Sequence, residues 1–492
     1  MDNVVALEPR TSSKVFADFK WPGVQILRVI DNEIRIPNTT SSPILIPKNE
    51  HLCQIRATHI VDDKKSIAPQ SKPVRPPADM SPPFSKTVIV DPNDHLGASW
   101  KARFSELNLK FDSVFEPVIG RYNDKSGRVR AHVTFGPALL PARKLHAPCY
   151  GKDNLQILQD KFDELEAQGV FARPEDVGVV VQHVSPSFLV RKASGIGYRL
   201  VTAFTTLGEY IKPLPTLMPT VESNLRVIAE WKFIITTDLR DAFYQIRLSK
   251  ESMKWCATQT PFRGLRVYLV ASQGLPGSSE WLEELMSLLF GKLVQEGWVS
   301  KVADDLYIGG QTIEQLFHNW VVVLNILYEN GLKLKSIKTF IAPTHAKILG
   351  WDWHLGHISA CAHKTLPLIK CEPPTTVTAL RSYIGAYKVF NRVLRGCASQ
   401  LDNIEQFIAG KQKNEKLMWT DTMLQSFKSS QVALSSATET TITLPRRDDQ
   451  LVIVHDGSQV GVGSVLYVNR NNSTQLAGYF SAKLKSTFVV PV

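Results

Sequence analysis

Two pairs of acidic residues lie beside apolar stretches whose composition is typical of β-strands. Asp238 and Asp241 follow the run FIITT, and Asp304 and Asp305 interrupt KVADDLYIGG. Carboxylates beside a buried strand are costly unless a cation or another partner compensates their charge. Mg²⁺ binds carboxylate, water and phosphate oxygens, and two such ions promote in-line phosphoryl displacement. The alternative is that Asp238 caps a turn and the Asp304–Asp305 doublet forms a solvated hairpin tip.

The segments around these acids alternate between strand and helix patterns. Strands are predicted at 233–239 and 301–309, and helices at 278–297 and 313–331. A further helix is predicted at 154–169, where a glycine ends the apolar periodicity. Strands that alternate with helices indicate an α/β layer that could position the acids.

Three motifs occur in order along this part of the chain. They are TDLRDAFYQI, then SQGLPGSS at 272–279, then VADDLYIGG at 302–310. The set resembles motifs A, B and C of reverse transcriptases and is similar to the Pol polyprotein of gypsy-type LTR retrotransposons, over about 100–490. The resemblance implies an α/β (α+β) right-hand fold of fingers, palm and thumb, and an RNA-directed DNA polymerase that adds dNTPs to a primer. It also implies that Asp238, Asp304 and Asp305 bind two Mg²⁺ ions, with Mn²⁺ as a substitute.

The same resemblance assigns residues around the incoming dNTP. Lys192 and Arg199, on the hairpin SPSFLVRKASGIGYRLVTAF, match cations that bind the triphosphate, although a solvated basic turn is the ordinary alternative. Phe243 matches the aromatic gate that excludes a ribose 2′-hydroxyl, and its alternative is core packing. Asp241 supports the triphosphate loop or is simply exposed.

Further matches lie in motifs B and D. Gln273 and Gly274 match the motif B pair next to the templating base pair, where an ordinary turn before a helix is the alternative. Lys338 in GLKLKSIKTF matches the motif D lysine, a proton donor to the departing pyrophosphate.

The template and primer are expected to contact two further segments. ILGWDW (348–353) resembles the primer grip, with Leu349, Gly350 and Trp351 as contact candidates, although the tryptophan could equally be a packing residue. The run at 376–396 resembles the thumb, and the spacing i, i+4, i+7 predicts one basic helical face. Such a face suits phosphate contacts, with a solvated face as the alternative, and its members are Lys388, Arg392 and Arg395.

The last part of the chain resembles the opening hairpin of a ribonuclease H domain. In LVIVHDGSQVGVGSVLYV, Asp456 matches the first metal ligand. The following acids of that family do not occur before Val492. One carboxylate cannot build a two-metal site, so no ribonuclease H activity is expected from this chain, which resembles a fragment of a longer reading frame.

Composition limits the other classes of function. The 492 residues suit two to four domains, and 43% hydrophobic residues argue against global disorder. A net charge of +11 favours a polyanionic partner, and six cysteines without a CxxC pair indicate neither a zinc site nor a disulfide framework. The chain lacks a signal peptide pattern and an apolar run long enough for a membrane span, so we expect a cytoplasmic, virus-like-particle or later nuclear location.

These features predict a modular chain. Expected partners are an RNA or DNA template with its primer, dNTPs and other Pol polyprotein segments, and no membrane. The alternative function is a catalytically silent or domesticated remnant that only binds nucleic acid. The predicted parts are a small all-β segment (1–60), a proline-rich linker (61–98), a helical extension (99–180), fingers and palm (181–360), thumb and connection (361–445), and a truncated ribonuclease H-like domain (446–492).

Overall fold

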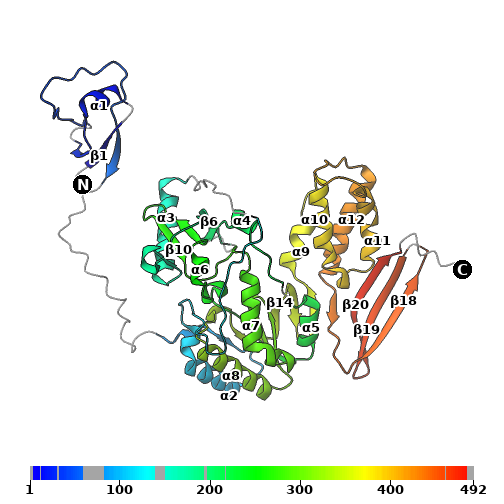
Figure 1. Cartoon of the computed structure of the whole chain (residues 1–492). Coiled ribbons are helices and arrows are strands. Elements are labelled where there is room, and N and C mark those ends of the chain that lie inside the picture. Colours follow the sequence, from blue (N-terminus) through cyan, green and yellow to red (C-terminus); the bar gives the residue numbers. More distant parts are fainter. Residues whose placement is uncertain are drawn as a thin grey trace. The chain divides into compact units, whose positions relative to one another are not determined.

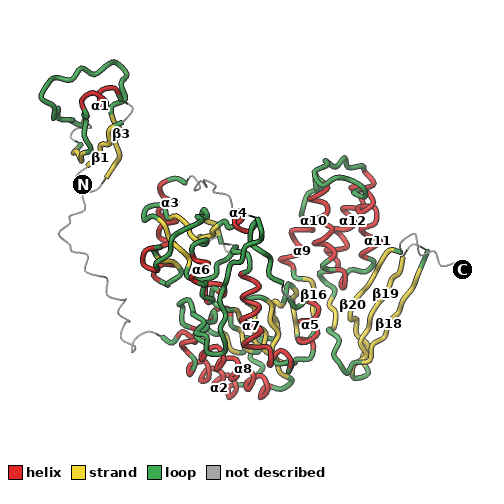
Figure 2. Tube along the Cα trace, in the orientation of Figure 1, coloured by secondary structure: helices red, strands yellow, loops and turns green. Residues whose placement is uncertain are grey.

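The computed structural model describes residues 4–10, 13–29, 33–58, 82–138, 150–192, 197–215, 218–459 and 461–484. Two compact units make up the chain, residues 1–81 and residues 82–492, drawn in Figures 1 and 2. No helix in the described ranges combines the length and the hydropathy that crossing a lipid bilayer requires.

The first unit is a three-stranded antiparallel sheet with one short helix. The sheet has the order β2-β1-β3, and Leu7 and Val15 are buried in its core. Ser13 caps the helix, because its hydroxyl accepts a hydrogen bond from the Phe16 N–H. The elements are β1 (Val4–Pro9), α1 (Lys14–Phe19), β2 (Gln25–Arg28) and β3 (Cys53–Thr58).

The expectation of an all-β segment over 1–60 is therefore wrong in one respect, because α1 belongs to it. Within that segment, the isoleucine-containing runs IRIPN (34–38) and PILIP (43–47) also form no strand. Both runs contain proline, which lacks the N–H group that a strand pairing needs.

The boundary between the two units lies earlier than the predicted linker end at residue 98. Residues 82–98 hold the 3₁₀ helix η1 (Phe84–Thr87) and strand β4 (Ile89–Val90). Strand β4 pairs in parallel with β13 (Phe340–Ile341), so this segment is an edge of the central sheet. A contact across about 250 residues leaves no local signature in a proline-rich sequence.

The central sheet of the second unit carries the acidic motifs. Its order is β11-β12-β8-β13-β4, with antiparallel pairing throughout except for β13 with β4. The single strand predicted at 301–309 is in fact two strands joined by the turn Ala303–Asp304. The remaining bounds are β8 (Phe233–Asp238), β11 (Val299–Val302) and β12 (Asp305–Gly310).

Both faces of this sheet are buried, and alternate residues point to different cores. Ile235 and Ile308 belong to the core that includes the palm helices, whereas Ile234 and Tyr307 belong to a second core that includes the helices after residue 361. The palm helices are α2 (Ala98–Lys110), α7 (Ser278–Gln295) and α8 (Ile313–Glu329), and α2 lies beside α8 in Figure 1.

Three of the predicted helices are confirmed. Helices α3 (Lys152–Ala167), α7 and α8 match the predicted ranges within a few residues. Each is followed by a glycine with positive φ, namely Gly169 (72°), Gly297 (73°) and Gly331 (72°). This left-handed conformation ends a helix and strongly favours glycine.

The second unit also contains two small sheets and a set of short helices. The sheets have the orders β5-β10-β9 and β6-β7. The elements are η2 (Asp112–Phe115), β5 (Phe171–Ala172), η3 (Glu175–Val177), β6 (Ser187–Arg191), β7 (Tyr198–Thr202), α4 (Thr205–Gly208), α5 (Val221–Ala229), η4 (Ala242–Gln245), α6 (Lys250–Met253), β9 (Ala257–Gln259) and β10 (Leu265–Tyr268).

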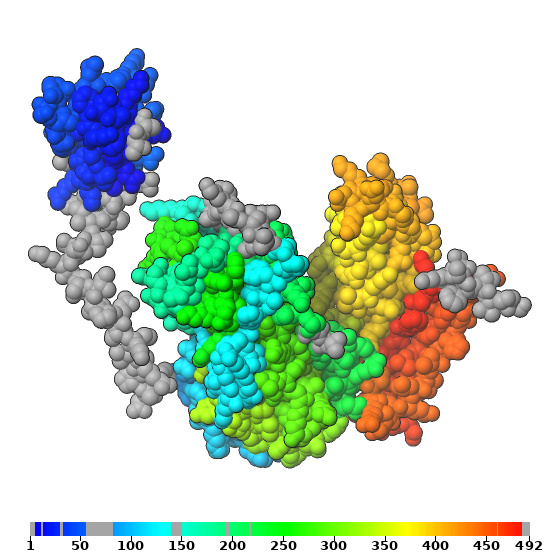
Figure 3. All heavy atoms as spheres, viewed as in Figure 1, coloured from blue at the N-terminus to red at the C-terminus, as the bar shows by residue number. Residues whose placement is uncertain are grey.

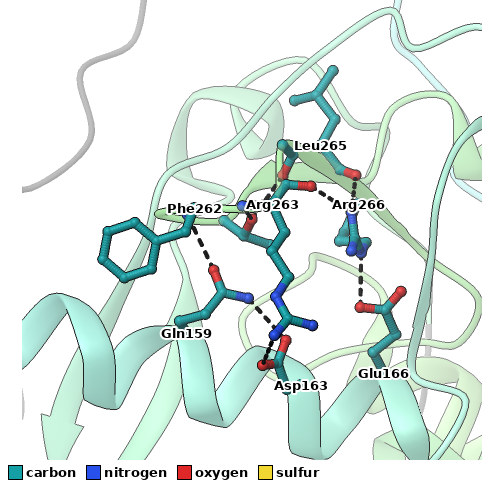
Figure 4. A network of polar contacts seen from close by, with 9 residues as sticks. Gln159, Asp163, Glu166, Phe262, Arg263, Leu265 and Arg266 are labelled. Atoms are coloured by element: carbon teal, nitrogen blue, oxygen red, sulfur yellow. Dashed lines mark hydrogen bonds and ion pairs between the residues drawn. The ribbon is translucent and has the colours of Figure 1, made fainter. Parts of the chain in front are cut away.

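A polar network attaches α3 to the β9–β10 hairpin (Figure 4). Gln159 Oε1 accepts a hydrogen bond from the Phe262 N–H at 3.1 Å, and the buried Arg266 donates to Glu166 at 2.8 Å. Asp163 pairs with Arg263 at 3.3 Å. Buried polar groups are stable only when satisfied in this way, so the network fixes the hairpin on α3.

Residues 336–443 form the 3₁₀ helix η5 and then a second sheet covered by helices. The sheet order is β14-β15-β16-β17, and β17 reaches it from beyond the helices, so the predicted boundary at 360 is crossed by this sheet. The elements are η5 (Ser336–Lys338), β14 (His345–Ile348), β15 (Trp351–His354), β16 (His357–Ala360), α9 (Ala362–Ile369), α10 (Val377–Lys388), η6 (Asn391–Val393), α11 (Cys397–Phe407), α12 (Asp421–Ala437) and β17 (Thr441–Thr443).

The last part of the second unit is an antiparallel meander of β18 (Gln450–Gly457), β19 (Gly461–Arg470) and β20 (Ser473–Lys483). All residues of β18 are exposed, including the aliphatic run 451–454. Strand β20 packs against η6 and α11. The meander therefore joins the helical part through β20 and leaves β18 as an uncovered edge.

Candidate active site

The ends of β8 and β12 bring the acids of two motifs together. Asp238 is the last residue of β8, Asp305 is the first residue of β12, and the antiparallel register places them opposite each other. Side chains at directly opposed positions share one face of a sheet. Asp304 lies in the adjoining turn, where its carbonyl accepts a hydrogen bond from the Leu239 N–H at 3.0 Å. All three acids lie at one end of the sheet.

Two lysines compensate this negative charge. Lys338 Nζ lies 2.6 Å from Asp238 Oδ2, and Lys335 Nζ lies 3.4 Å from the same oxygen. The hydrogen bond to Asp238 raises the pKa of Lys338. Partial burial, followed by the charges of Asp304 and Asp238, raises the pKa of Asp305 to about 6, although its side chain still reaches solvent. A carboxyl with a raised pKa indicates a site that favours added positive charge.

The donor set fits a hard divalent cation. Asp238 Oδ1 is buried and has no hydrogen-bond partner, and the other two acids add further carboxylate oxygens. Within the described ranges, no group of three or more His, Cys, Asp or Glu side chains is gathered around a common metal position. In this arrangement the ammonium of Lys338 is bonded to the Asp238 carboxylate. The predicted proton donor of motif D therefore contacts a predicted metal ligand.

The turn after Asp238 carries the next two predicted residues. Asp241 is exposed and has left-handed backbone angles (φ 45°, ψ 53°) at the start of η4. Phe243 is half-buried, and its ring packs on the edge of the palm core. Both the gate and the packing interpretations of this phenylalanine therefore remain compatible with its position.

The basic hairpin predicted in the fingers is formed by β6 and β7. Lys192 and Arg199 are exposed, and the Lys192 N–H donates to the Gly197 carbonyl at 3.1 Å. The hairpin tip at 193–196 lies outside the described residues. Arg199 lies close enough to the motif A turn to affect Tyr244, whose pKa is raised to about 12 mainly by burial and is lowered slightly by Arg199. The fingers thus bring a cation near that turn.

The motif B loop lies between β10 and α7. Gln273 is exposed, and Gly274 has a φ of 86°, a conformation that favours glycine. A Cβ at Gly274 would lie 3.5 Å from the Thr202 carbonyl of β7, which is an ordinary contact distance. The backbone conformation, rather than a lack of space, requires this glycine.

The predicted primer grip is a tight hairpin between β14 and β15. Leu349 (φ 51°) and Gly350 (φ 87°) form its two-residue turn, a geometry that fits the twist of paired strands. Trp351 is only 4% exposed and packs against Phe390. Its side chain belongs to the core, which favours the packing alternative for Trp351, and Leu349 and Gly350 are the candidates at the surface.

The predicted basic face of the thumb does not form. Helix α10 ends at Lys388, Arg392 lies in the 3₁₀ helix η6, and Arg395 follows that helix. Lys388 pairs with Glu405 at 2.6 Å, and Arg392 pairs with Glu222 at 2.9 Å. The first two cations are therefore engaged in ion pairs within the protein, and they do not share a helical face with the third.

Asp456, the predicted ribonuclease H ligand, lies on β18. It is exposed, and its Oδ1 accepts a hydrogen bond from the Gly457 N–H at 2.9 Å.

Sequence reasoning missed three residues that support the site. Lys335 is the second cation on Asp238, and its spacing of three from Lys338 in KLKSIK was the available signal. Gln245 and Arg121 bond the backbone of the motif A turn, with Gln245 donating to the Arg240 carbonyl and Arg121 to the Tyr244 carbonyl. Neither has a sequence signal, because their partners are set by tertiary structure.

Comparison with known proteins identifies the class. Residues 190–353 match the family described as reverse transcriptase (RNA-dependent DNA polymerase). The fold is similar to the foamy viral protease-reverse transcriptase in complex with dsDNA, at a TM-score of 0.68 and 18% identity over 82% of this chain and 81% of that one. The complex of that enzyme with an RNA/DNA hybrid is similar at a TM-score of 0.63 and 18% identity, over 82% of this chain and 52% of that one. The second unit therefore contains a reverse transcriptase domain in a mixed α/β fold.

The sequence relatives are transposon polyproteins. The Tf2-3 and Tf2-7 polyproteins of Schizosaccharomyces pombe are each 21% identical to this chain over 423 residues, which is 82% of this chain. The chain spans 30% of the length of these relatives. The reverse transcriptase domain thus has its sequence homologues within transposon polyproteins.

Proposed function

We propose that this chain is an RNA-directed DNA polymerase that extends a primer 3′-end with dNTPs by two-metal phosphoryl transfer. The observation that carries the proposal is the register that opposes Asp238 and Asp305, with Asp304 beside them. The reverse transcriptase match over 190–353 includes all three positions. Burial of acids in this arrangement costs free energy unless a cation compensates their charge. Asp238 Oδ1 is buried without a hydrogen-bond partner, so it is available as a metal ligand.

Each group has a defined task in this proposal. Asp238, Asp304 and Asp305 would hold two Mg²⁺ ions, or Mn²⁺ in their place, and these ions would supply activation of the primer hydroxyl and charge stabilisation of the leaving pyrophosphate. Lys192 and Arg199 neutralise the triphosphate, since charge stabilisation provides much of phosphoryl-transfer catalysis.

Motif B and the primer grip position the substrates. Gln273 and Gly274 lie beside the templating base pair, and Leu349 and Gly350 contact the primer. The hollow that Figure 3 shows between the yellow helices and the green part of the second unit is a place for the template and primer. Nucleic acid in the related solved complexes supports this assignment.

The decisive experiment is magnesium-dependent extension of a primed RNA template. Asp304→Asn abolishes extension while thermal unfolding and template–primer binding stay at the parental level. Asp448→Asn, an equal change of charge at an exposed loop acid, leaves extension unchanged. Equal extension by the parent and Asp304→Asn contradicts the metal assignment.

A parent chain that retains a primed template on a filter but extends it with neither Mg²⁺ nor Mn²⁺ contradicts the catalytic proposal. That result favours the nucleic-acid-binding remnant as the function of the chain.

A second test concerns the sugar. The half-buried Phe243 ring excludes a 2′-hydroxyl, so Phe243→Ala increases incorporation of rNTPs relative to dNTPs. Phe243→Tyr, which keeps the ring, retains parental discrimination. If Phe243→Ala keeps the parental ratio of rNTP to dNTP incorporation, Phe243 does not act as the gate.

We further propose that the meander β18–β20 is a ribonuclease H-like segment with Asp456 as its first acid. The uncovered aliphatic edge of β18 supports a larger sheet in the assembled protein. We place the polymerase in the cytoplasm or in a virus-like particle, together with other polyprotein segments.

A further inference from the structure

The buried amide of Gln245 bridges two segments that meet at the candidate active site. Gln245 ends η4 and is 0% exposed. Its Nε2 donates to the Arg240 carbonyl at 2.6 Å and to the Lys333 carbonyl at 3.1 Å. Its Oε1 accepts from the Lys333 N–H at 2.9 Å. Two carbonyl partners on one end and one N–H on the other make the orientation of the amide unambiguous.

Backbone contacts continue this bridge as far as Asp238. Leu239 pairs with Leu334 in an isolated antiparallel bridge, and the Lys335 N–H donates to the Asp238 carbonyl at 3.0 Å. Gln245 therefore secures a short ladder whose far end carries Asp238.

The bridged segments carry the residues proposed to act on substrate. The first, residues 238–245, includes the acid Asp238 and the half-buried Phe243. The second, residues 333–338, includes Lys338, which bonds Asp238. Gln245 thus ties the two segments together, although it is fully buried.

The protein is closely packed around this amide. A Cβ on Gly120 would lie 2.3 Å from Gln245 Oε1 and 2.9 Å from the Gly331 carbonyl. Gly120 has no positive φ, so its backbone conformation does not require glycine. An alanine at this position would displace the amide, which gives a second way to perturb the bridge.

We propose that Gln245 is a positioning residue of the polymerase, which sets the motif A turn against the segment of Lys338 and so determines dNTP binding and sugar discrimination. The inference rests on the proposed function and adds to it a residue outside the substrate-contacting set. Displacements of about 1 Å at a reacting site change rates by up to roughly 100-fold. A buried amide with three hydrogen bonds can impose that degree of alignment.

The test separates positioning from a general loss of stability. Gln245→Met removes the three hydrogen bonds at similar side-chain volume. Gly120→Ala leaves Gln245 in the chain but shifts the position of its amide. Gln159→Met is the matched control, because Gln159 is also a buried glutamine (2% exposed) with an amide hydrogen-bonded in the network of Figure 4. Thermal unfolding, template–primer affinity, the KM for dNTP, kcat and the dNTP/rNTP ratio are measured for each variant.

The expected result is a rise of roughly 10- to 100-fold in the KM for dNTP, with a lower dNTP/rNTP ratio, in Gln245→Met and Gly120→Ala. Template–primer affinity stays within about twofold of the parent in both. Gln159→Met lowers stability but keeps the parental KM and ratio. If Gln245→Met does not fold, Gly120→Ala and Gln245→Glu, which keeps only the acceptor, decide the question.

Two outcomes overturn the inference, and they are distinguishable. A parental KM and ratio in the folded bridge variants, or the same change in Gln159→Met, refutes the role of Gln245 while the polymerase proposal stands. A parent chain that extends no primer overturns the proposed function and this inference together.

Discussion

A buried ion pair between α7 and β11 supports the hairpin that carries Asp304 and Asp305. Lys301 Nζ contacts Glu283 Oε1, and the two side chains are 6% and 9% exposed. Ser287 adds a hydrogen bond of 3.2 Å to the same carboxylate oxygen, whereas Glu283 Oε2 has no partner. We expect Lys301→Met to leave the Glu283 carboxylate buried and unpaired.

The magnitude follows from the burial of both partners. Removal of one member of a buried pair costs about 3–5 kcal/mol of unfolding free energy, because the remaining charge is not solvated. Replacement of both members by apolar residues is often neutral, so Lys301→Met combined with Glu283→Leu recovers most of the loss. The coupling energy of the double-mutant cycle is therefore about 2 kcal/mol or more.

Urea unfolding of the four proteins measures this cycle, and hydrogen exchange of the β11–β12 amides localises the effect. Lys411→Met is the control, since Lys411 forms a more exposed pair with Glu415 (32% and 40% exposed). We expect that control to cost less than about 1 kcal/mol. Additive single effects, or a loss in Lys301→Met no larger than in the control, would refute the reasoning.

Three further predictions use other contacts. A Cβ on Gly309 would lie 1.7 Å from the ring of Trp231, so Gly309→Ala lowers the unfolding free energy by at least about 1–3 kcal/mol in chemical denaturation. Burial lowers the pKa of His357 and of His354, so the folded protein binds fewer protons than the unfolded chain and loses stability as the pH falls through about 6.5. Denaturation at pH 7.5 and 5.5 shows this loss, and His357→Asn reduces it. Removal of metal with EDTA abolishes extension, added Mg²⁺ or Mn²⁺ restores it, and titration of Asp305→Asn with Mg²⁺ gives a weaker metal affinity.

Local patterns predicted the helices and the strand ends well. The glycines after α3, α7 and α8 ended the periodicity where the helices end, because a left-handed residue cannot continue them. The apolar run before Asp238 gave β8 to within one residue. The turn at Asp304–Asp305 was harder to predict, because a continuous strand and two strands joined by a tight turn show the same alternation of side chains.

The thumb illustrates how periodicity misleads. The run 376–396 was expected to be one helix, with Lys388, Arg392 and Arg395 at i, i+4 and i+7 on one face. A 3₁₀ turn presents nearly the same spacing and is tighter than an α-helix. Poor helix formers such as Asn391 allow the break after Lys388, and the predicted stripe of cations is lost with it.

The candidate site separates local information from long-range information. The acids lie at strand ends, which single-sequence patterns can locate. The groups that orient them come from far along the chain: Gln245 reaches Lys333 across 88 residues, Arg121 reaches Tyr244 across 123, and Lys338 reaches Asp238 across 100. Gln245 and Arg121 lie in stretches where no local rule distinguishes a supporting polar residue from an exposed one, whereas Lys338 was singled out by its motif alone. Chemistry can therefore be proposed from motifs, but the residues that align it require the tertiary contacts.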